Sequence, residues 1–216
     1  MLLCISIVQV GSIFFLLLVL STIDGVMGRM IQFRTAKRLS LPLSREEFAG
    51  FERWWQQKSA VDIVKNNPGL LTLESKGASR YIANLAPLAF PGLTIKSTVM
   101  FDILREEKTI QVSCNQGSLE QQYEGVAFLR DLVSKLKPTV VSNNSFGIDE
   151  AVPCLFSDAN LEIAFEIAPW FPVNADFLER GGSSAIGLGI DKDIGAFLEN
   201  VLKAYRLESA PAIVVN

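Results

Sequence analysis

Apolar and polar residues alternate along several stretches of this chain, and the alternation predicts a sheet with one buried face. The long alternating stretches are residues 31–43, 94–104 and 155–167. Shorter strands are predicted at residues 61–65, 70–74, 81–85 and 110–114, and residues 139–148 are predicted as a strand or an extended loop. We therefore expect an antiparallel sheet of about six or seven strands.

A helical repeat replaces the alternation in three places. Ser44-Arg45-Glu46-Glu47 is a capping box, which predicts a helix to about residue 57 that carries the adjacent Trp54 and Trp55. Residues 119–137 predict an amphipathic helix, which a proline then stops. The last helix is expected to open at residues 173–179, to break at Gly181 and Gly182, and to restart at Asp191. Its apolar stripe comprises Ile190, Ile194, Phe197, Leu198, Val201 and Tyr205.

Two proline-containing segments are predicted to lack regular structure. Residues 87–92, Pro-Leu-Ala-Phe-Pro-Gly, form an apolar loop, which either packs over an end of the sheet or contacts a ligand or membrane. Residues 169–172, Pro-Trp-Phe-Pro, form a rigid corner before the last helix.

The N-terminus is apolar from residue 1 to 20, apart from Ser6, Gln9, Gly11 and Ser12, and no Lys or Arg precedes Arg29. Three interpretations remain open: a targeting leader, a membrane anchor of about 20 residues, or an artefact of gene prediction. Basic residues after an anchor would keep the domain on the cytoplasmic or stromal side. We expect a hydrophobic segment at 1–29, a folded domain at 30–208 and a flexible tail at 209–216, in a protein that is membrane-associated or plastid-targeted.

The composition excludes several chemistries. The net charge of −3 argues against nucleic-acid binding. Since the chain contains no His, Ser-His-Asp and Cys-His nucleophiles and imidazole metal ligands are excluded, which leaves only carboxylate or thiolate metal sites. We expect no metal and no cofactor. Of three cysteines, Cys114 and Cys154 are predicted as buried thiols, with one disulfide between them as the alternative. Asp102 is the candidate acid if the protein is an enzyme.

Several short motifs in the sequence are similar to those of a known protein family. Phe33-Arg34-Thr35-Ala36 leads into a Leu/Ser strand, and Phe171-Pro172 precedes Phe177-Leu178-Glu179-Arg180-Gly181. With Phe197-Leu198 and Tyr205, these resemble the DUF1997 family of plants, algae and cyanobacteria, which is START-like (SRPBCC). The resemblance implies an α+β helix-grip fold, a curved antiparallel sheet around a long C-terminal helix, with residues 119–137 as an additional inserted helix. The family has no settled biochemical role and no agreed catalytic residues.

A gripped helix can enclose an apolar cavity. The aromatic and aliphatic residues expected to line or close it, unless they are ordinary core, are Trp54, Trp55, Phe101, Phe165, Trp170, Phe177, Ile194 and Phe197. The first hypothesis is therefore non-enzymatic binding of a hydrophobic small molecule such as a lipid, pigment or isoprenoid. The alternative is an interaction or assembly protein of a (photosynthetic) membrane complex, held at the membrane by residues 1–20. Catalysis is the third hypothesis.

Overall fold

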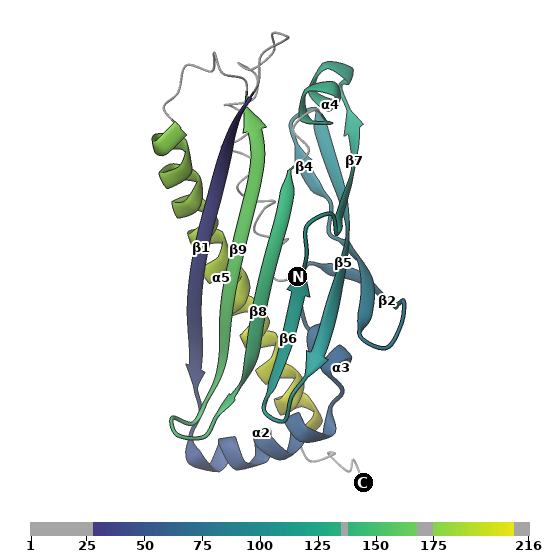
Figure 1. The fold of residues 1–216 in the computed structure, drawn as a ribbon. Helices are drawn as coiled ribbons and strands as arrows, with labels where there is room; N and C mark the ends of the chain where they lie inside the picture. Colours follow the sequence, from purple (N-terminus) through teal and green to yellow (C-terminus); the bar gives the residue numbers. More distant parts are fainter. Residues whose placement is uncertain (1–27, 135–137, 168–174, 210–216) are drawn as a thin grey trace.

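The computed structural model describes residues 28–134, 138–167 and 175–209 of the chain, arranged as Figure 1 shows. The strands are β1 (Arg29–Pro42), β2 (Leu70–Ser75), β3 (Arg80–Leu85), β4 (Leu88–Phe90), β5 (Leu93–Arg105), β6 (Thr109–Cys114), β7 (Leu119–Gly125), β8 (Thr139–Asp149) and β9 (Cys154–Ile167). The helices are α2 (Arg45–Gln57), α3 (Ala60–Val64), α4 (Ala127–Ser134) and α5 (Ala175–Ser209). Within these ranges the strands form one nine-stranded antiparallel sheet, in the order β1-β9-β8-β6-β5-β3-β2, with β4 and β7 also paired to β5.

The pairing of β1 with β9 sets the two faces of the sheet. The register runs from Arg29 opposite Ile167 to Pro42 opposite Cys154 without a shift. Because successive side chains point to opposite faces, odd-numbered residues such as Phe33 face inward, where Phe33 is buried. The even-numbered Arg34 faces outward and pairs with Glu162 at 3.0 Å.

Helix α5 runs along the inner side of the sheet from one end of the molecule to the other (Figure 1). It packs closely against β1, because a Cβ added to Gly182 would lie 2.3 Å from Cε1 of Phe33. The predicted break at Gly181 and Gly182 is wrong, since α5 is one helix of 35 residues. The glycine at 182 permits close packing instead of ending the helix.

Helices α2 and α3 close the lower end of the sheet in the view of Figure 1. Ser44 Oγ accepts a hydrogen bond of 3.1 Å from the Glu47 amide, which confirms the predicted start of α2. The apolar side of α2 meets the end of α5, where the ring centroids of Phe51 and Tyr205 are 5.2 Å apart. The short strand predicted at residues 61–65 is wrong, because Ser59 caps a helix there by accepting from the Asp62 amide.

The opposite end of the sheet carries β4, β7 and α4 (Figure 1). Two predictions fail there. Residues 88–90 form a strand on β5 instead of a loop, and residues 119–125 form β7 instead of the first turns of a helix. The inserted helix is therefore limited to α4 in the described part of the chain. It begins after Gly125, which has φ +126° and where a Cβ would lie 2.3 Å from the Gly92 carbonyl oxygen.

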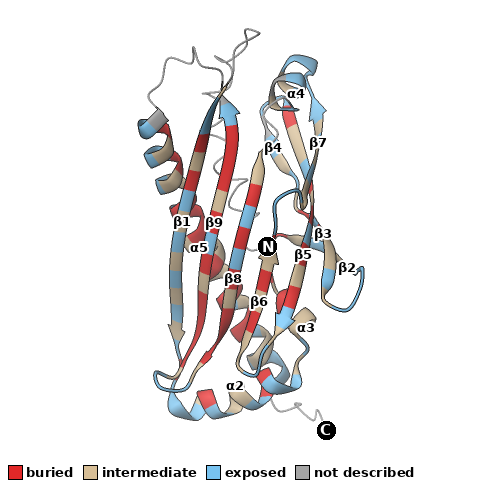
Figure 2. Cartoon of the chain, in the orientation of Figure 1, coloured by how far each residue is buried: buried red, intermediate tan, exposed pale blue. Residues whose placement is uncertain are grey.

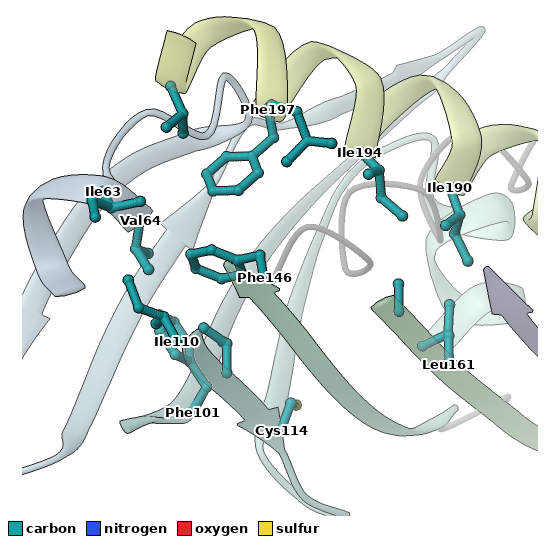
Figure 3. Packing of buried hydrophobic residues seen from close by; sticks show 14 of the residues in the cluster. Ile63, Val64, Phe101, Ile110, Cys114, Phe146, Leu161, Ile190, Ile194 and Phe197 are labelled. Carbon is teal, nitrogen blue, oxygen red and sulfur yellow. The ribbon is translucent and has the colours of Figure 1, made fainter. Parts of the chain in front are cut away.

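The core lies between the inner face of the sheet and α5, with α2 and α3 at one end. In Figure 3 Ile190, Ile194 and Phe197 point from α5 toward Phe146 and Leu161 of the sheet. Figure 2 shows that buried residues recur along β9, β8 and β6 and on α5. The predicted α+β helix-grip fold is confirmed, with nine strands among the described residues in place of about six or seven.

Several predictions fall outside the described residues. They concern the apolar N-terminal segment up to residue 27, the corner at 169–172 and the tail after residue 209. Among the helices of the described ranges, none is both long and apolar enough to span a bilayer.

Candidate functional site

Polar side chains interrupt the apolar inner face near the middle of the sheet. On β8, Ser142 and Asn144 occupy inward positions between Val140 and Phe146. On the neighbouring strand β9, Ser157 lies opposite Phe146 and therefore diagonal to Asn144. Since diagonal neighbours on one face of a sheet are about 7–8 Å apart, the three polar side chains form one cluster, which we call the inner polar cluster.

The inner polar cluster is buried and lacks hydrogen bonds. Relative exposures are 2% for Ser142, 1% for Asn144 and 0% for Ser157. Ser142 Oγ, Ser157 Oγ and both amide atoms of Asn144 have no hydrogen-bond partner in the described structure. Leaving such a group unpaired in an apolar interior costs about 1–3 kcal/mol. Natural interiors rarely hold several such groups together without a water or ligand between them.

Apolar side chains surround the cluster on both neighbouring strands. Ser142 stands between Cys114 of β6 and Leu161 of β9, and Asn144 stands between Val112 and Ala159 in the same way. All four neighbours are at most 3% exposed. An occupant of this site would therefore meet hydrogen-bonding groups at one place and hydrocarbon around it.

The charged groups Lys37 and Arg105 near the inner face bond to residues outside the inner polar cluster. Lys37, two strands from Asn144 in the same row, forms an ion pair of 2.7 Å with Asp191 of α5. At the end of β5, Arg105 donates to the Trp55 carbonyl oxygen at 2.7 Å, and its guanidinium carbon lies 5.7 Å from the Trp55 ring centroid. Burial lowers the pKa of Arg105, and its Nη1 is buried without a partner.

A second polar group on the inner face is internally bonded. Tyr123 of β7 donates to Gln121 Oε1 at 2.8 Å, and Gln121 donates to Ser97 Oγ at 3.5 Å. Burial raises the pKa of Tyr123, so this phenol remains a neutral donor. Tyr123, Gln121 and Ser97 thus bond to one another, whereas the side chains of the inner polar cluster do not.

The outer face of the same strands carries a groove of about 380 Å³. It is lined by Arg34, Thr35, Ala36, Val141, Asn143, Asn160, Leu161 and Glu162. Its charged groups are already paired, as Arg34 and Glu162 show, and Asn143 and Asn160 are exposed to solvent. Nothing in this groove therefore requires a ligand.

Six of the residues predicted to line a cavity belong to the buried core cluster: Trp54, Trp55, Phe101, Phe165, Ile194 and Phe197. Phe146 of β8 contacts two of them, with its ring centroid 5.0 Å from that of Phe197 and 6.4 Å from that of Trp55. Phe177 lies apart from the core with 72% exposure. Trp170 lies outside the described residues. Lining of a cavity stays a prediction for this set.

Other sequence predictions are now placed. Asp102 was the candidate cavity acid, but it lies on the outer face of β5 and pairs with Arg80 at 3.3 Å. The alternative disulfide is absent: Cys114 and Cys154 are buried and not joined. Cys114 lies in the same row of the sheet as Ser142 and Leu161. Cys154 is seven residues along β9 from Leu161, which is about 23 Å at the rise of a strand, too far for a disulfide. No group of three His, Cys, Asp or Glu in the described ranges could hold a metal ion.

The inner polar cluster was not predicted from the sequence, although a signal was present. Val140, Phe146 and Ile148 alternate with the correct period for one buried face, which places Ser142 and Asn144 on that face as well. Treating residues 139–148 as a strand or an extended loop hid this consequence.

Comparisons with known proteins place the chain only by shape. No known protein family matches the sequence, so membership of DUF1997 has no support beyond the quoted residues. No curated protein matches it either.

Among solved structures, similar chains cover most of this one at low sequence identity. A protein of unknown function from Staphylococcus aureus has 9% identity and a TM-score of 0.43, covering 84% of this chain and 99% of its own. A conserved protein from Geobacillus kaustophilus has 14% identity and a TM-score of 0.41, with coverages of 82% and 97%. The Zhui aromatase/cyclase from Streptomyces sp. R1128 has 13% identity and a TM-score of 0.35, with coverages of 84% and 98%. Likenesses this distant assign neither a ligand nor a reaction.

Proposed function

We propose that this protein binds a hydrophobic small molecule between α5 and the inner face of its sheet, without transforming it. The observation that carries the proposal is the inner polar cluster of Ser142, Asn144 and Ser157, buried and unpaired. A core selected for stability alone would place apolar side chains there, because each unpaired group costs stability. Retained unpaired polar groups are what a small-molecule site uses to orient a mostly apolar ligand.

Non-enzymatic binding is favoured over catalysis by the side chains around the cluster. Ser142 and Ser157 have no histidine, lysine or carboxylate bonded to them that could act as a base. Asp102 forms an ion pair with Arg80 on the outer face of the sheet. Serine, asparagine and apolar groups can hold a molecule in place, but alone they supply no proton transfer near neutral pH.

Native mass spectrometry of the purified full-length protein tests this function, together with solvent extraction of the same sample. The expected result is a mass in excess of the polypeptide that extraction removes and identifies as a small apolar compound. A protein that carries nothing and takes up no apolar compound on incubation would contradict the proposal.

A second candidate function is docking of one end of the molecule on a lipid surface. Met30, Phe128 and Phe177 are 53%, 56% and 72% exposed. They lie on β1, α4 and α5 at the end of the molecule where β1 begins (Figure 1). The apolar residues 1–20 join the chain just before β1, so a membrane that took up this run would lie near this end.

Vesicle flotation tests the second candidate with the Phe128→Asp and Phe177→Asp double variant. We expect the variant to float less well than the unchanged protein, whereas Leu71→Asp, also at an exposed position, should float normally. Equal flotation of the Phe128→Asp, Phe177→Asp protein and the unchanged protein would contradict docking by this end.

A further inference from the structure

We infer that the ligand carries an uncharged oxygen group, a hydroxyl or carbonyl, that hydrogen-bonds to Asn144 and Ser142. The inference rests on the proposed function and specifies the chemical class of molecule that this site accepts. It is carried by the identity of the unpaired atoms and by the charges around them.

The unpaired atoms offer both halves of a hydrogen bond. Asn144 presents an acceptor, Oδ1, and a donor, Nδ2, and neither has a partner. The Ser142 hydroxyl, two residues away on the same face of β8, can act as donor or acceptor. A hydroxyl uses both halves, and a carbonyl oxygen accepts from the amide and the hydroxyl together.

A charged headgroup fits this position poorly. A buried carboxylate or ammonium needs an opposite charge or several hydrogen bonds, since desolvation otherwise makes it costly. Lys37, in the same row, is held by Asp191, and Val112 and Ala159 flank Asn144 directly. A neutral group requires no countercharge and matches the amide.

Arg105 is the competing anchor, and it predicts a different ligand. Its unpaired Nη1 would favour a carboxylate. Its guanidinium, however, already donates to the Trp55 carbonyl oxygen and lies over the Trp55 ring at the end closed by α2. Asn144 lies among small and aliphatic neighbours in the middle of the sheet, where an apolar molecule has hydrocarbon on both sides.

The test compares probes that differ only in the headgroup. Binding of 1-dodecanol, dodecanoic acid and dodecylamine to the full-length protein is measured by native mass spectrometry and by tryptophan fluorescence near pH 7.5. Farnesol, farnesoic acid and farnesylamine are used in parallel to cover a branched chain. We expect the alcohol of at least one series to bind about tenfold or more tightly than its acid and amine, the size of one hydrogen bond with a buried partner.

Two variants and one matched control assign the selectivity to the site. Asn144→Leu should weaken alcohol binding about tenfold while leaving binding of the acid within about threefold. Ser142→Ala, which changes side-chain volume little, should weaken alcohol binding in the same direction if Asn144→Leu fails to fold. Asn143→Leu alters the adjacent residue of the same type on the exposed face and should change neither affinity.

The possible outcomes separate the two proposals. Apolar probes that bind with the acid as tight as the alcohol, or with no effect of either variant, would overturn the assigned ligand class and leave binding itself intact. Tightest binding of the acid would point to Arg105 as the anchor. If no probe binds and the purified protein carries no molecule, the proposed function fails as well.

Discussion

Gly182 of α5 lies against the ring of Phe33 on β1, with room for a hydrogen atom but not for a methyl group. A Cβ at residue 182 would fall 2.3 Å from Phe33 Cε1 and 2.5 Å from Cδ1. The next residue, Ser183, also contacts β1, because its Oγ accepts a hydrogen bond of 3.2 Å from the Arg34 amide. This close approach fixes how near the helix lies to the sheet, and so shapes the interior that a ligand would enter.

Replacing Gly182 by Ala should therefore destabilise the protein although alanine is the better helix former. Overpacking of this kind costs about 1–3 kcal/mol. Gly181→Ala is the matched control, because a Cβ there meets no atom within 4 Å, and it should stabilise the protein by about 0.5–1 kcal/mol. Urea unfolding of both variants measures the difference, and equal stabilities would show that α5 does not pack on Phe33 as described.

Removing an unpaired hydroxyl from the inner polar cluster should stabilise the ligand-free protein. Ser157 is fully buried with its Oγ unpaired, so Ser157→Ala should remove a desolvation cost of about 1–3 kcal/mol. Ser40→Ala, at an exposed position of β1, should stay within about 0.5 kcal/mol of the unchanged protein. Thermal unfolding after solvent extraction provides the comparison, and a clear loss of stability in Ser157→Ala would indicate a hydrogen bond that the account lacks.

Acid should loosen the contact between the end of α5 and α2. Glu208 Oε2 accepts from Lys58 at 2.6 Å and from Trp54 Nε1 at 2.8 Å. The hydrogen bonds from Lys58 and Trp54 lower the pKa of Glu208 below its ordinary value of 4.5. A carboxyl with a lowered pKa contributes stability above its ordinary pKa, and this contribution is lost as pH falls through the folded-state value.

The pH dependence is measured as the unfolding temperature between pH 7 and pH 3, for the unchanged protein and for Glu208→Gln. Since Glu208 is at the surface, the effect should be small. We expect the variant to lose less stability on acidification, because it has no carboxyl to protonate at this position. If the unfolding temperatures of the two proteins fell equally with pH, protonation of Glu208 would not contribute to the loss of stability.

The fold was predictable where one signal covered a whole element. The alternation at residues 31–43 and 155–167 was sufficient for β1 and β9, and the capping box at Ser44 was sufficient for the start of α2. The prediction failed where the pattern of one element was applied to the residues of the element before it. The helical repeat after residue 126 was carried back over Leu119 and Tyr123, which in fact alternate along β7 and pair with β5.

The candidate site was less predictable than the fold. The aromatic residues proposed as lining, such as Phe101 and Phe197, were recognised as apolar and are buried, but burial alone does not separate a lining from a core. The alternation of Val140, Phe146 and Ile148 already places Asn144 on the buried face, and the register, with Asn144 opposite Ala159, brings it close to Ser157 of β9. The helix break predicted at Gly182 was wrong for a related reason. The contact of Gly182 with Phe33, which requires a glycine there, joins residues far apart in the sequence.

An experimental crystal structure of the protein as purified, with its bound contents retained, distinguishes an occupied ligand site from an ordinary core. We expect electron density for a molecule other than water between α5 and β8, with an uncharged oxygen group within hydrogen-bonding distance of Asn144 Nδ2. An interior filled by side chains, or by ordered water alone bonded to Ser142, Asn144 and Ser157, would contradict this expectation.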